Sequence, residues 1–285
     1  MTASKFTTHD MQRCKDEGRK FTMLSIYDYP TALLADRAGL DTILVGDSLA
    51  MTALGHADTV SVTLDEMLHH VKAVARAASS PMVVADMPFL SYQVSQRDAI
   101  ANAGRFLKEG RADAVKLEGG SPIAATVAAI HGAGIPVMGH IGLTPQSAAQ
   151  LGGLKVQGKD ARAAQALIDD ALLLEDAGAF AVIMECVPAQ VARIVTERLS
   201  VPSISYGAGP HCDGQGMVSA DMLGMFERFM PKFAKQYVDL GSQILKAFEA
   251  YREEVSTGAF PGDEHSYHID AEQLALLTKT PDGKG

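Results

Sequence analysis

Short apolar runs alternate along the chain with longer segments that have a helical pattern. Most of the runs are continuously apolar rather than alternating between apolar and polar residues, as is typical of strands covered by helices. The pattern therefore predicts a parallel sheet. Seven runs are expected to be strands, with 216–220 as a weaker eighth: 22–26, 42–46, 82–86, 113–117, 136–140, 180–185 and 202–206.

The intervening segments carry helix signals at their ends. Thr63 and Ser95 stand where N-caps are expected, and Gly110, Gly132 and Gly178 stand where helices end. The expected helices cover 64–78, 96–109, 123–131, 161–177 and 189–199. No linker rich in Pro, Ser or Gly divides the chain, so the repeating units predict an α/β fold with a single (β/α)8 TIM barrel.

The C-terminal part has a different pattern. Residues 232–254 have the amphipathic pattern of a long helix, which we expect to pack on the barrel or on a neighbouring subunit. Residues 263–285 are polar, and their last residues are expected to be frayed. We therefore predict a barrel domain over 1–262 that includes this helix, followed by a polar tail over 263–285.

Composition excludes several classes of protein. With 47 % hydrophobic residues among 285, the chain can fill a substantial core. Its 25 Lys and Arg against 34 Asp and Glu give a net charge of −9, which disfavours nucleic-acid binding. No apolar run approaches the ~18 residues of a membrane span, and residues 1–20 lack the apolar centre of a secretion signal. We expect a soluble, cytoplasmic protein with neither a nucleic-acid nor a membrane partner.

Polar side chains recur where the predicted strands end. In a parallel barrel all of these ends open onto one face, so residues distant in sequence are expected to converge there. The residues are Asp47, Ser48, Asp86, Lys116, Glu118, His140 and Glu185.

Asp47 and Asp86 indicate a metal site. Two or three carboxylates without Cys or paired His make an all-oxygen site, which suits Mg²⁺ better than Zn²⁺. Without a cation, close carboxylates would repel and at least one would take up a proton. The alternative is that both residues only cap helix N-termini.

Lys116 lies in an otherwise apolar strand, where an ammonium group needs a partner. We expect that partner to be the carboxylate of a ligand, with an ion pair to Glu118 or Asp86 as the alternative. A Schiff-base role is less favoured, because an imine would duplicate the electron sink that a metal supplies.

Glu185 and His140 are candidates for proton transfer. The apolar neighbours of Glu185 favour a raised pKa and general acid or base chemistry near neutral pH. His140 could donate a hydrogen bond to a developing oxyanion or hydroxyl, or could equally be a core residue.

The glycine-rich stretches do not indicate a nucleotide site, because neither a dinucleotide fingerprint nor a P-loop is present. Residues 152–158 are either a flexible loop that could act as a lid or a surface turn.

Several segments at the predicted strand ends form longer motifs: Val45-Gly-Asp-Ser-Leu, Ala85-Asp-Met-Pro-Phe, Val115-Lys-Leu-Glu-Gly-Gly, Gly139-His-Ile-Gly-Leu-Thr-Pro-Gln-Ser and Glu185-Cys-Val-Pro, together with Tyr27-Asp-Tyr. With these motifs in order, the chain resembles the ketopantoate hydroxymethyltransferase family over about residues 21–268. The resemblance implies a (β/α)8 barrel that transfers a one-carbon unit from 5,10-methylenetetrahydrofolate to 3-methyl-2-oxobutanoate. The product would be ketopantoate, on the route to pantothenate and coenzyme A.

The same resemblance implies roles for site residues. Asp47 and Asp86 would bind Mg²⁺ with Glu118 close by, and Ser48 and Lys116 would hold the carboxylate and ketone region of the 2-oxo acid. Glu185 would accept the proton. Loss of the C3 proton gives an enolate, which a chelated metal stabilises as a Lewis acid while Lys116 adds positive charge. Family members are commonly homo-oligomers, often decamers.

Several residues depart from the family pattern. The family usually has glycine at the position of Ala50, proline at Ser61, Gly-Ile at Ser205-Tyr206 and histidine at Ala220. A tyrosine at the end of the seventh strand would narrow the pocket or add a hydroxyl donor. One alternative function is therefore a Mg²⁺-dependent aldolase or carbon–carbon lyase acting on a different 2-oxo acid or aldehyde. Another is a catalytically silent oligomeric paralogue, which the retained acidic and basic residues argue against.

Overall fold

Eight parallel strands close into one barrel in chain order. The computed structural model describes residues 4–278, and the chain divides into two compact units, Met1–Tyr237 and Val238–Gly285. The first unit is a (β/α)8 TIM barrel, as the sequence predicts, because β1 pairs in parallel with both β2 and β8 and closes the sheet. The strands are β1 (Phe21–Ser25), β2 (Thr42–Val45), β3 (Met82–Asp86), β4 (Ala114–Glu118), β5 (Val137–Gly142), β6 (Ala179–Glu185), β7 (Ser203–Tyr206) and β8 (Gly214–Val218).

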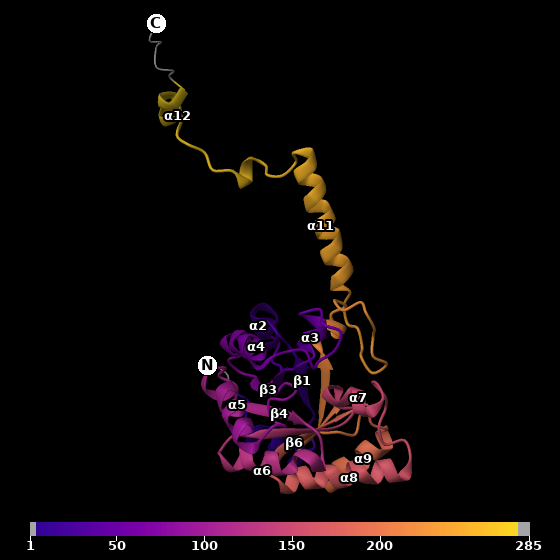
Figure 1. Ribbon diagram of the computed structural model, residues 1–285. Helices are drawn as coiled ribbons and strands as arrows, with labels where there is room; N and C mark the ends of the chain where they lie inside the picture. Colours follow the sequence, from indigo (N-terminus) through magenta and orange to yellow (C-terminus); the bar gives the residue numbers. More distant parts are fainter. Residues whose placement is uncertain (1–3, 279–285) are drawn as a thin grey trace. The chain divides into compact units, whose positions relative to one another are not determined.

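The predicted helices of the barrel are confirmed to within about a residue at each end. They are α4 (Leu64–Ala77), α5 (Gln96–Lys108), α6 (Ala124–Gly132), α8 (Ala161–Asp176) and α9 (Ala189–Arg198). Figure 1 shows α5, α6, α8 and α9 outside the strands. Thr63 forms a capping box with Glu66, and the Ser95 side chain accepts a hydrogen bond from the Asp98 backbone N–H. Further helices are α1 (Thr8–Asp16), α2 (Tyr29–Arg37), α3 (Leu49–Thr52), α7 (Ala148–Leu151) and α10 (Ser219–Met222), and 3₁₀ turns cover Ser121–Ile123 and Pro145–Ser147.

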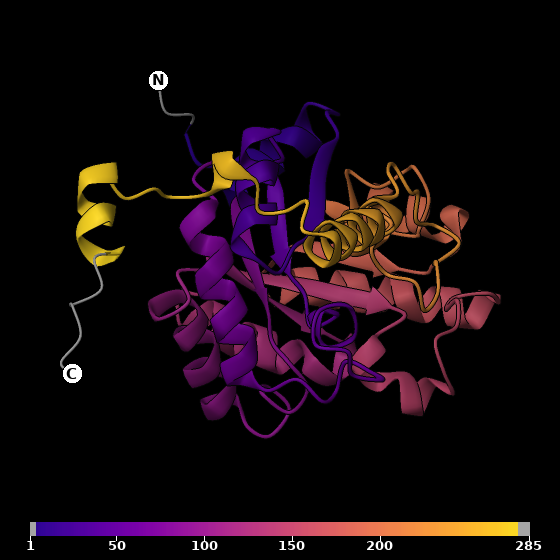
Figure 2. The ribbon, with the colours of Figure 1, turned by 90° about the horizontal axis from the view of Figure 1, so that it is seen from above.

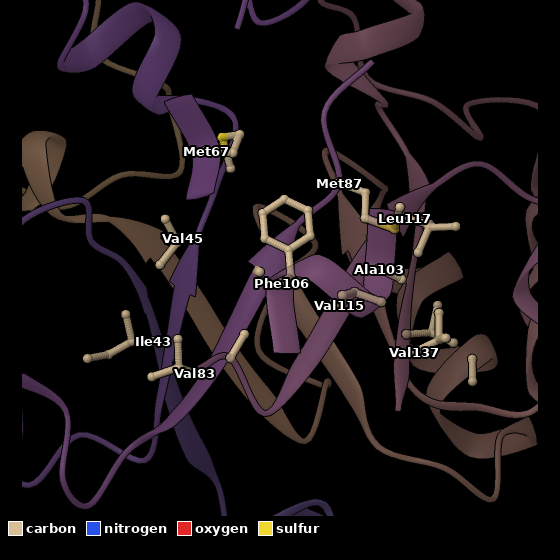
Figure 3. Close-up of a cluster of buried hydrophobic side chains, with 14 of the residues drawn as sticks. Ile43, Val45, Met67, Val83, Met87, Ala103, Phe106, Val115, Leu117 and Val137 are labelled. Atoms are coloured by element: carbon tan, nitrogen blue, oxygen red, sulfur yellow. The ribbon is translucent and has the colours of Figure 1, made fainter. Parts of the chain in front are cut away.

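The apolar side chains form two layers, one outside the strands and one inside. In the outer layer Phe106 of α5 lies among strand residues such as Val83 and Val115 (Figure 3). In the inner layer Met11 and Cys14 of α1 belong to the same buried cluster as side chains at the start of β1 and β3. Helix α1 therefore closes the amino-terminal end of the barrel. Figure 2 shows the barrel from above, with helices around the strands.

Two sequence-based boundaries need correction. The eighth strand is Gly214–Val218 rather than 216–220, because the chain turns into α10 at Ser219. The long helix, α11, covers Leu240–Thr257 rather than 232–254. It begins late because the preceding segment is held by the barrel: Phe233 lies against Gly207, and the backbone N–H of Tyr237 donates to the carbonyl of Met222.

The second unit contains α11, a 3₁₀ turn (Asp263–His265) and α12 (Ala271–Thr278). The side chain of Asp239 caps the start of α11, and no residue of this helix is buried. In the structure the boundary between the two units follows residue 237, so α11 belongs to the C-terminal unit. The domain boundary predicted from the sequence follows residue 262 and includes this helix in the barrel domain. The expected frayed end falls on residues 279–285, outside the described residues. Among residues 4–278, no helix is both long and apolar enough to span a membrane.

Candidate active site

A cavity of about 840 Å³ lies at the carboxyl ends of the barrel strands. Its lining contains every residue that the sequence singled out at the strand ends: Asp47, Ser48, Asp86, Lys116, Glu118, His140 and Glu185. They come from β2 to β6 and the turns that follow these strands. The parallel arrangement thus brings them together from positions up to 138 residues apart (185 − 47).

Three carboxylates form the centre of the polar group. One oxygen each of Asp47, Asp86 and Glu118 lie within 4.8 Å of one another, and all three residues are buried. Burial together with the negative charges of Asp86 and Glu118 raises the pKa of Asp47 well above its usual value. The raised pKa of Asp47 reflects the expected repulsion between the carboxylates.

Lys116 is the cation that contacts this group. Its Nζ lies 2.7 Å and 2.8 Å from the two carboxylate oxygens of Asp86 and 3.3 Å from Oε1 of Glu118. Burial alone would lower the pKa of Lys116, but the negative charges of Asp86 and Glu118 outweigh it and raise that pKa. The structure thus contains the ion pairs that were the alternative for Lys116, and a ligand carboxylate as its partner stays a prediction.

The residues fit a divalent cation. If all are ionised, three carboxylates and one ammonium carry a charge of −3 + 1 = −2, which a divalent ion would balance. The donor atoms are all oxygen, as Mg²⁺ prefers. Neither aspartate caps a helix: Asp86 accepts from the backbone N–H of Asp47 at 3.1 Å, and Asp47 accepts from Gln146 at 2.9 Å. The helix-cap alternative is therefore wrong.

His140 lies between two carboxylates. Its Nδ1 is 3.5 Å from Glu118 and its Nε2 is 3.4 Å from Glu185, which is longer than a well-formed hydrogen bond. Burial and the nearby Lys116 charge lower the pKa of His140, so the imidazole is neutral at pH 7. A neutral ring in this position has an N–H available for a ligand.

Glu185 faces the cavity on the other side of His140. Its side chain keeps 20 % of its surface exposed. Burial, and secondarily the charge of Glu118, raise the pKa of Glu185 to about 8. Glu118 behaves in the opposite way: burial would raise its pKa, but Lys116 and His140 lower it to about 2. Of these two carboxyl groups, Glu185 is the one poised to exchange a proton near neutral pH.

Sequence reasoning gave no role to Gln146, which organises the carboxylates. Its side-chain amide donates to Asp47 at 2.9 Å, and its backbone N–H donates to Glu118 at 3.0 Å. The hydroxyl of Tyr92 donates to the Gln146 carbonyl oxygen at 2.8 Å and so fixes the orientation of the amide. Gln146 lies inside a segment that carried the family resemblance, so a signal was present without a role attached to it.

Ser48 and the glycine-containing loop also line the cavity. The hydroxyl groups of Ser48 and Tyr27 are 2.8 Å apart, which orients the serine. Leu154 and Val156 of the 152–158 loop reach the cavity, although both are largely exposed. This loop is therefore part of the wall of the site.

One residue that departs from the family pattern, Tyr206, has its side chain in the wall of the cavity. Tyr206 lines the cavity, and its hydroxyl lies 3.1 Å from the hydroxyl of Ser25. Ala50 is buried in the core, and Ser61 bonds to Asp58 at the surface at 3.0 Å. Among the five departures, Tyr206 is the one that lines this cavity.

Comparison with known proteins agrees with this arrangement. A family sequence model described as "Ketopantoate hydroxymethyltransferase" matches residues 5–263. The chain belongs to the ketopantoate hydroxymethyltransferase family. It is therefore an enzyme of the one-carbon transferase type.

Curated relatives match over nearly the whole chain. The 3-methyl-2-oxobutanoate hydroxymethyltransferase of Moorella thermoacetica is 57 % identical over 264 residues, covering 93 % of this chain and 98 % of the relative. The enzyme of the same name from Heliobacterium modesticaldum is 56 % identical, covering 96 % of this chain and 99 % of the relative.

Solved structures share the fold at low sequence identity. Phosphonopyruvate hydrolase, in a complex with oxalate and Mg²⁺, has a TM-score of 0.60 at 14 % identity and covers 95 % of this chain and 94 % of its own. The 2,3-dimethylmalate lyase, of the PEP mutase/isocitrate lyase superfamily, has a TM-score of 0.57 at 16 % identity, with coverage of 95 % and 94 %. These likenesses support the barrel architecture and do not assign a reaction.

Proposed function

We propose that this enzyme transfers a hydroxymethyl group from 5,10-methylenetetrahydrofolate to 3-methyl-2-oxobutanoate, forming ketopantoate for pantothenate and coenzyme A biosynthesis. The observation that carries the proposal is a proton-accepting carboxyl, Glu185, in one cavity with three clustered carboxylates and a buried lysine. The names of relatives that are 56–57 % identical support the choice of substrate.

The acidic cluster would hold the metal and, with it, the 2-oxo acid. Asp47 and Asp86 are the proposed Mg²⁺ ligands, with Glu118 close by. When bound, Mg²⁺ supplies positive charge that polarises the ketone of the 2-oxo acid. The Ser48 hydroxyl and the Lys116 ammonium bind the carboxylate and ketone oxygens of the substrate, and both groups line the cavity.

Glu185 removes the C3 proton of the bound acid. Its raised pKa gives it the affinity needed to take a proton from carbon. Lys116 stabilises the negative charge that develops on the ketone oxygen as the enolate forms. His140 donates to the newly formed hydroxyl group from its position beside Glu185.

The overall reaction balances with one water. The keto acid loses hydrogen from C3 and gains a CH₂OH group at that carbon, while methylenetetrahydrofolate loses its methylene and leaves as tetrahydrofolate. Water supplies the hydroxyl oxygen. No oxidant or reductant is required.

Proton exchange tests the proposal directly. The protein is incubated with 3-methyl-2-oxobutanoate and Mg²⁺ in deuterated water, and the C3 proton signal is followed by NMR with and without the folate donor. We expect exchange without the donor and ketopantoate when it is added. Absence of exchange with this and other 2-oxo acids would instead identify a catalytically silent paralogue.

The aldolase or lyase alternative keeps the same acidic site with another substrate. The observation that favours it is Tyr206 in the cavity wall, where the family usually has an aliphatic residue. Exchange of the C3 proton without turnover on addition of the folate donor would support this alternative and exclude the transferase.

We also propose that the chain forms a homo-oligomer, such as a decamer, in the cytoplasm. The apolar side chains along α11 support association, because they recur at helical spacing and are exposed in the single chain: Ile244, Leu245, Phe248, Tyr251 and Val255. Measurement of the molar mass in solution tests the subunit number.

A further inference from the structure

Asp221 is a buried carboxylate that the mechanism above does not use. It lies in α10, directly after β8, and lines the 840 Å³ cavity while keeping only 4 % of its surface exposed. Among residues 4–278, no side chain or backbone group forms a hydrogen bond or ion pair with its carboxylate. Burial raises the pKa of Asp221 to about 6, and no cation offsets this. A carboxylate that is buried without a partner is costly, so it is suited to a ligand that brings hydrogen-bond donors.

The cavity that Asp221 and the acidic centre both line also has aromatic and apolar walls. Phe226, Phe229 and Phe233 of the segment after α10 line it, and the rings of Phe226 and Phe229 are 5.5 Å apart in an edge-to-face arrangement. Leu154 contributes a further apolar side chain from the 152–158 loop. These side chains give the cavity the kind of wall that accepts a flat ring system.

The size of the cavity leaves room for a second molecule. A five-carbon keto acid bound at the acidic centre would fill a small part of a volume of about 840 Å³. Lys232 also lines the cavity and is exposed, so it adds a positive charge at the edge. The ligand indicated is thus a flat heterocycle with paired N–H donors, and an anionic extension that can reach Lys232.

We infer that Asp221 binds the 2-amino-4-oxopyrimidine edge of the pterin ring in the folate donor, with the aromatic side chains packing on the ring. This edge offers two adjacent N–H groups to the two oxygens of one carboxylate, a bidentate pairing that adds both strength and orientation. The negatively charged glutamate part of the folate extends toward Lys232. The inference rests on the proposed function, because it assigns the binding site of that reaction's second substrate.

Replacement of Asp221 tests the assignment. Asp221→Asn keeps the shape but replaces one accepting oxygen with an N–H₂ group, so the Kd for tetrahydrofolate and the KM for the methylene donor should rise by ~10- to 100-fold. The matched control is Glu227→Gln, which neutralises an exposed carboxylate in the same segment and should change neither value. Equal binding of tetrahydrofolate by wild type and Asp221→Asn, or equal weakening in the control, would overturn the inference.

A second measurement does not depend on how a variant folds. Wild-type enzyme should bind a tetrahydrofolate analogue that lacks the 2-amino group at least ~10-fold more weakly than tetrahydrofolate itself. In Asp221→Asn this preference should largely disappear. Guanosine carries the same donor edge, and competition by guanosine as strong as that by tetrahydrofolate would assign the site to a nucleoside and contradict the inference.

The exchange experiment separates this inference from the proposed function. C3 exchange and ketopantoate formation by wild type, together with unchanged folate binding in Asp221→Asn, would refute only the role of Asp221. Failure of wild type to exchange the C3 proton or to form ketopantoate would refute the proposed function and the assignment that depends on it.

Discussion

The ring of Tyr206 occupies the space that a side chain at position 216 would need. A β-carbon at Gly216 would lie 2.0 Å from Cε2 of Tyr206, far inside van der Waals contact. The two residues lie on neighbouring strands, β7 and β8, and the tyrosine hydroxyl is 3.1 Å from Ser25 on β1. The glycine therefore makes it possible for a large aromatic residue to fit in the wall of the cavity.

The first prediction concerns this pair. Gly216→Val should force the Tyr206 ring toward the cavity, lower the free energy of unfolding by ~1–3 kcal/mol and raise the KM for the 2-oxo acid. The double variant Gly216→Val with Tyr206→Ile should recover much of both losses, because the two residues share one space. Urea unfolding and steady-state kinetics measure these effects.

Gly104 provides a control for the glycine substitution. It lies in α5, and nothing lies within 4 Å of the position of its β-carbon. Gly104→Ala should be neutral or stabilise the protein by up to ~1 kcal/mol, through helix propensity. If Gly216→Val were as stable as Gly104→Ala, the steric coupling would be wrong.

The second prediction concerns the buried ion pairs of Lys116. Lys116→Met leaves Asp86 and Glu118 without their cation, so the free energy of unfolding in EDTA should fall by ~3–5 kcal/mol. Lys72→Met is the matched control: its Nζ lies 3.6 Å from Glu109 at the surface, where a pair contributes ~0–1 kcal/mol. Urea unfolding measures both variants, and equal effects would contradict the argument.

The third prediction concerns the repulsion within the carboxylate cluster. Asp47→Asn should stabilise the metal-free protein near pH 8 by ~1 kcal/mol, since burial and the charges of Asp86 and Glu118 disfavour an ionised carboxylate at this position. Because the folded-state pKa of Asp47 is raised, its contribution favours folding at low pH and is lost as pH rises through that pKa. Wild-type stability without metal should therefore fall with pH more steeply than that of the variant.

Magnesium should reverse the order of stability, so that wild type becomes more stable than Asp47→Asn. In ~10 mM Mg²⁺, the Tm of wild type should rise clearly, because the ion binds only the folded protein. The Tm of Asp47→Asn should rise little or not at all. An equal Tm rise in both proteins would show that Asp47 does not bind the ion.

The fourth prediction concerns Glu185 as the base. Glu185→Gln should slow C3 proton exchange by at least ~10²-fold, because the amide cannot accept the proton, while binding of the keto acid with Mg²⁺ is largely retained. Exchange is followed by NMR and binding by calorimetry. Normal exchange in this variant would exclude Glu185 as the base.

The pH dependence of exchange follows from the same residue. Only the ionised carboxylate can take the proton, so the rate should rise with pH through the Glu185 pKa of about 8 and level off above it. Bound Mg²⁺ adds positive charge nearby and should shift the midpoint below this value. A rate that falls as pH rises through this range would contradict the assignment.

The sequence by itself determined the barrel and the positions of most site residues. Continuous apolar strands and capped helices specify a repeating parallel unit, and the predicted polar residues stand at or near the carboxyl ends of β2 to β6. The convergence of Asp47, Asp86 and Lys116 at one end follows from that repeat, because all strands of a parallel barrel run in one direction.

Only the tertiary structure decided which atoms meet. Three features depend on side-chain packing across the closed barrel. They are the two hydrogen bonds from Lys116 to Asp86, the hydrogen bond from Gln146 to Asp47, and the burial of Asp221 without a hydrogen-bond partner. The late start of α11 depends likewise on Phe233 lying against Gly207. The apolar periodicity along a helix or strand predicts which of its faces is buried. It does not predict which side chains of different elements touch, because closure of the sheet fixes the distances and directions between the elements.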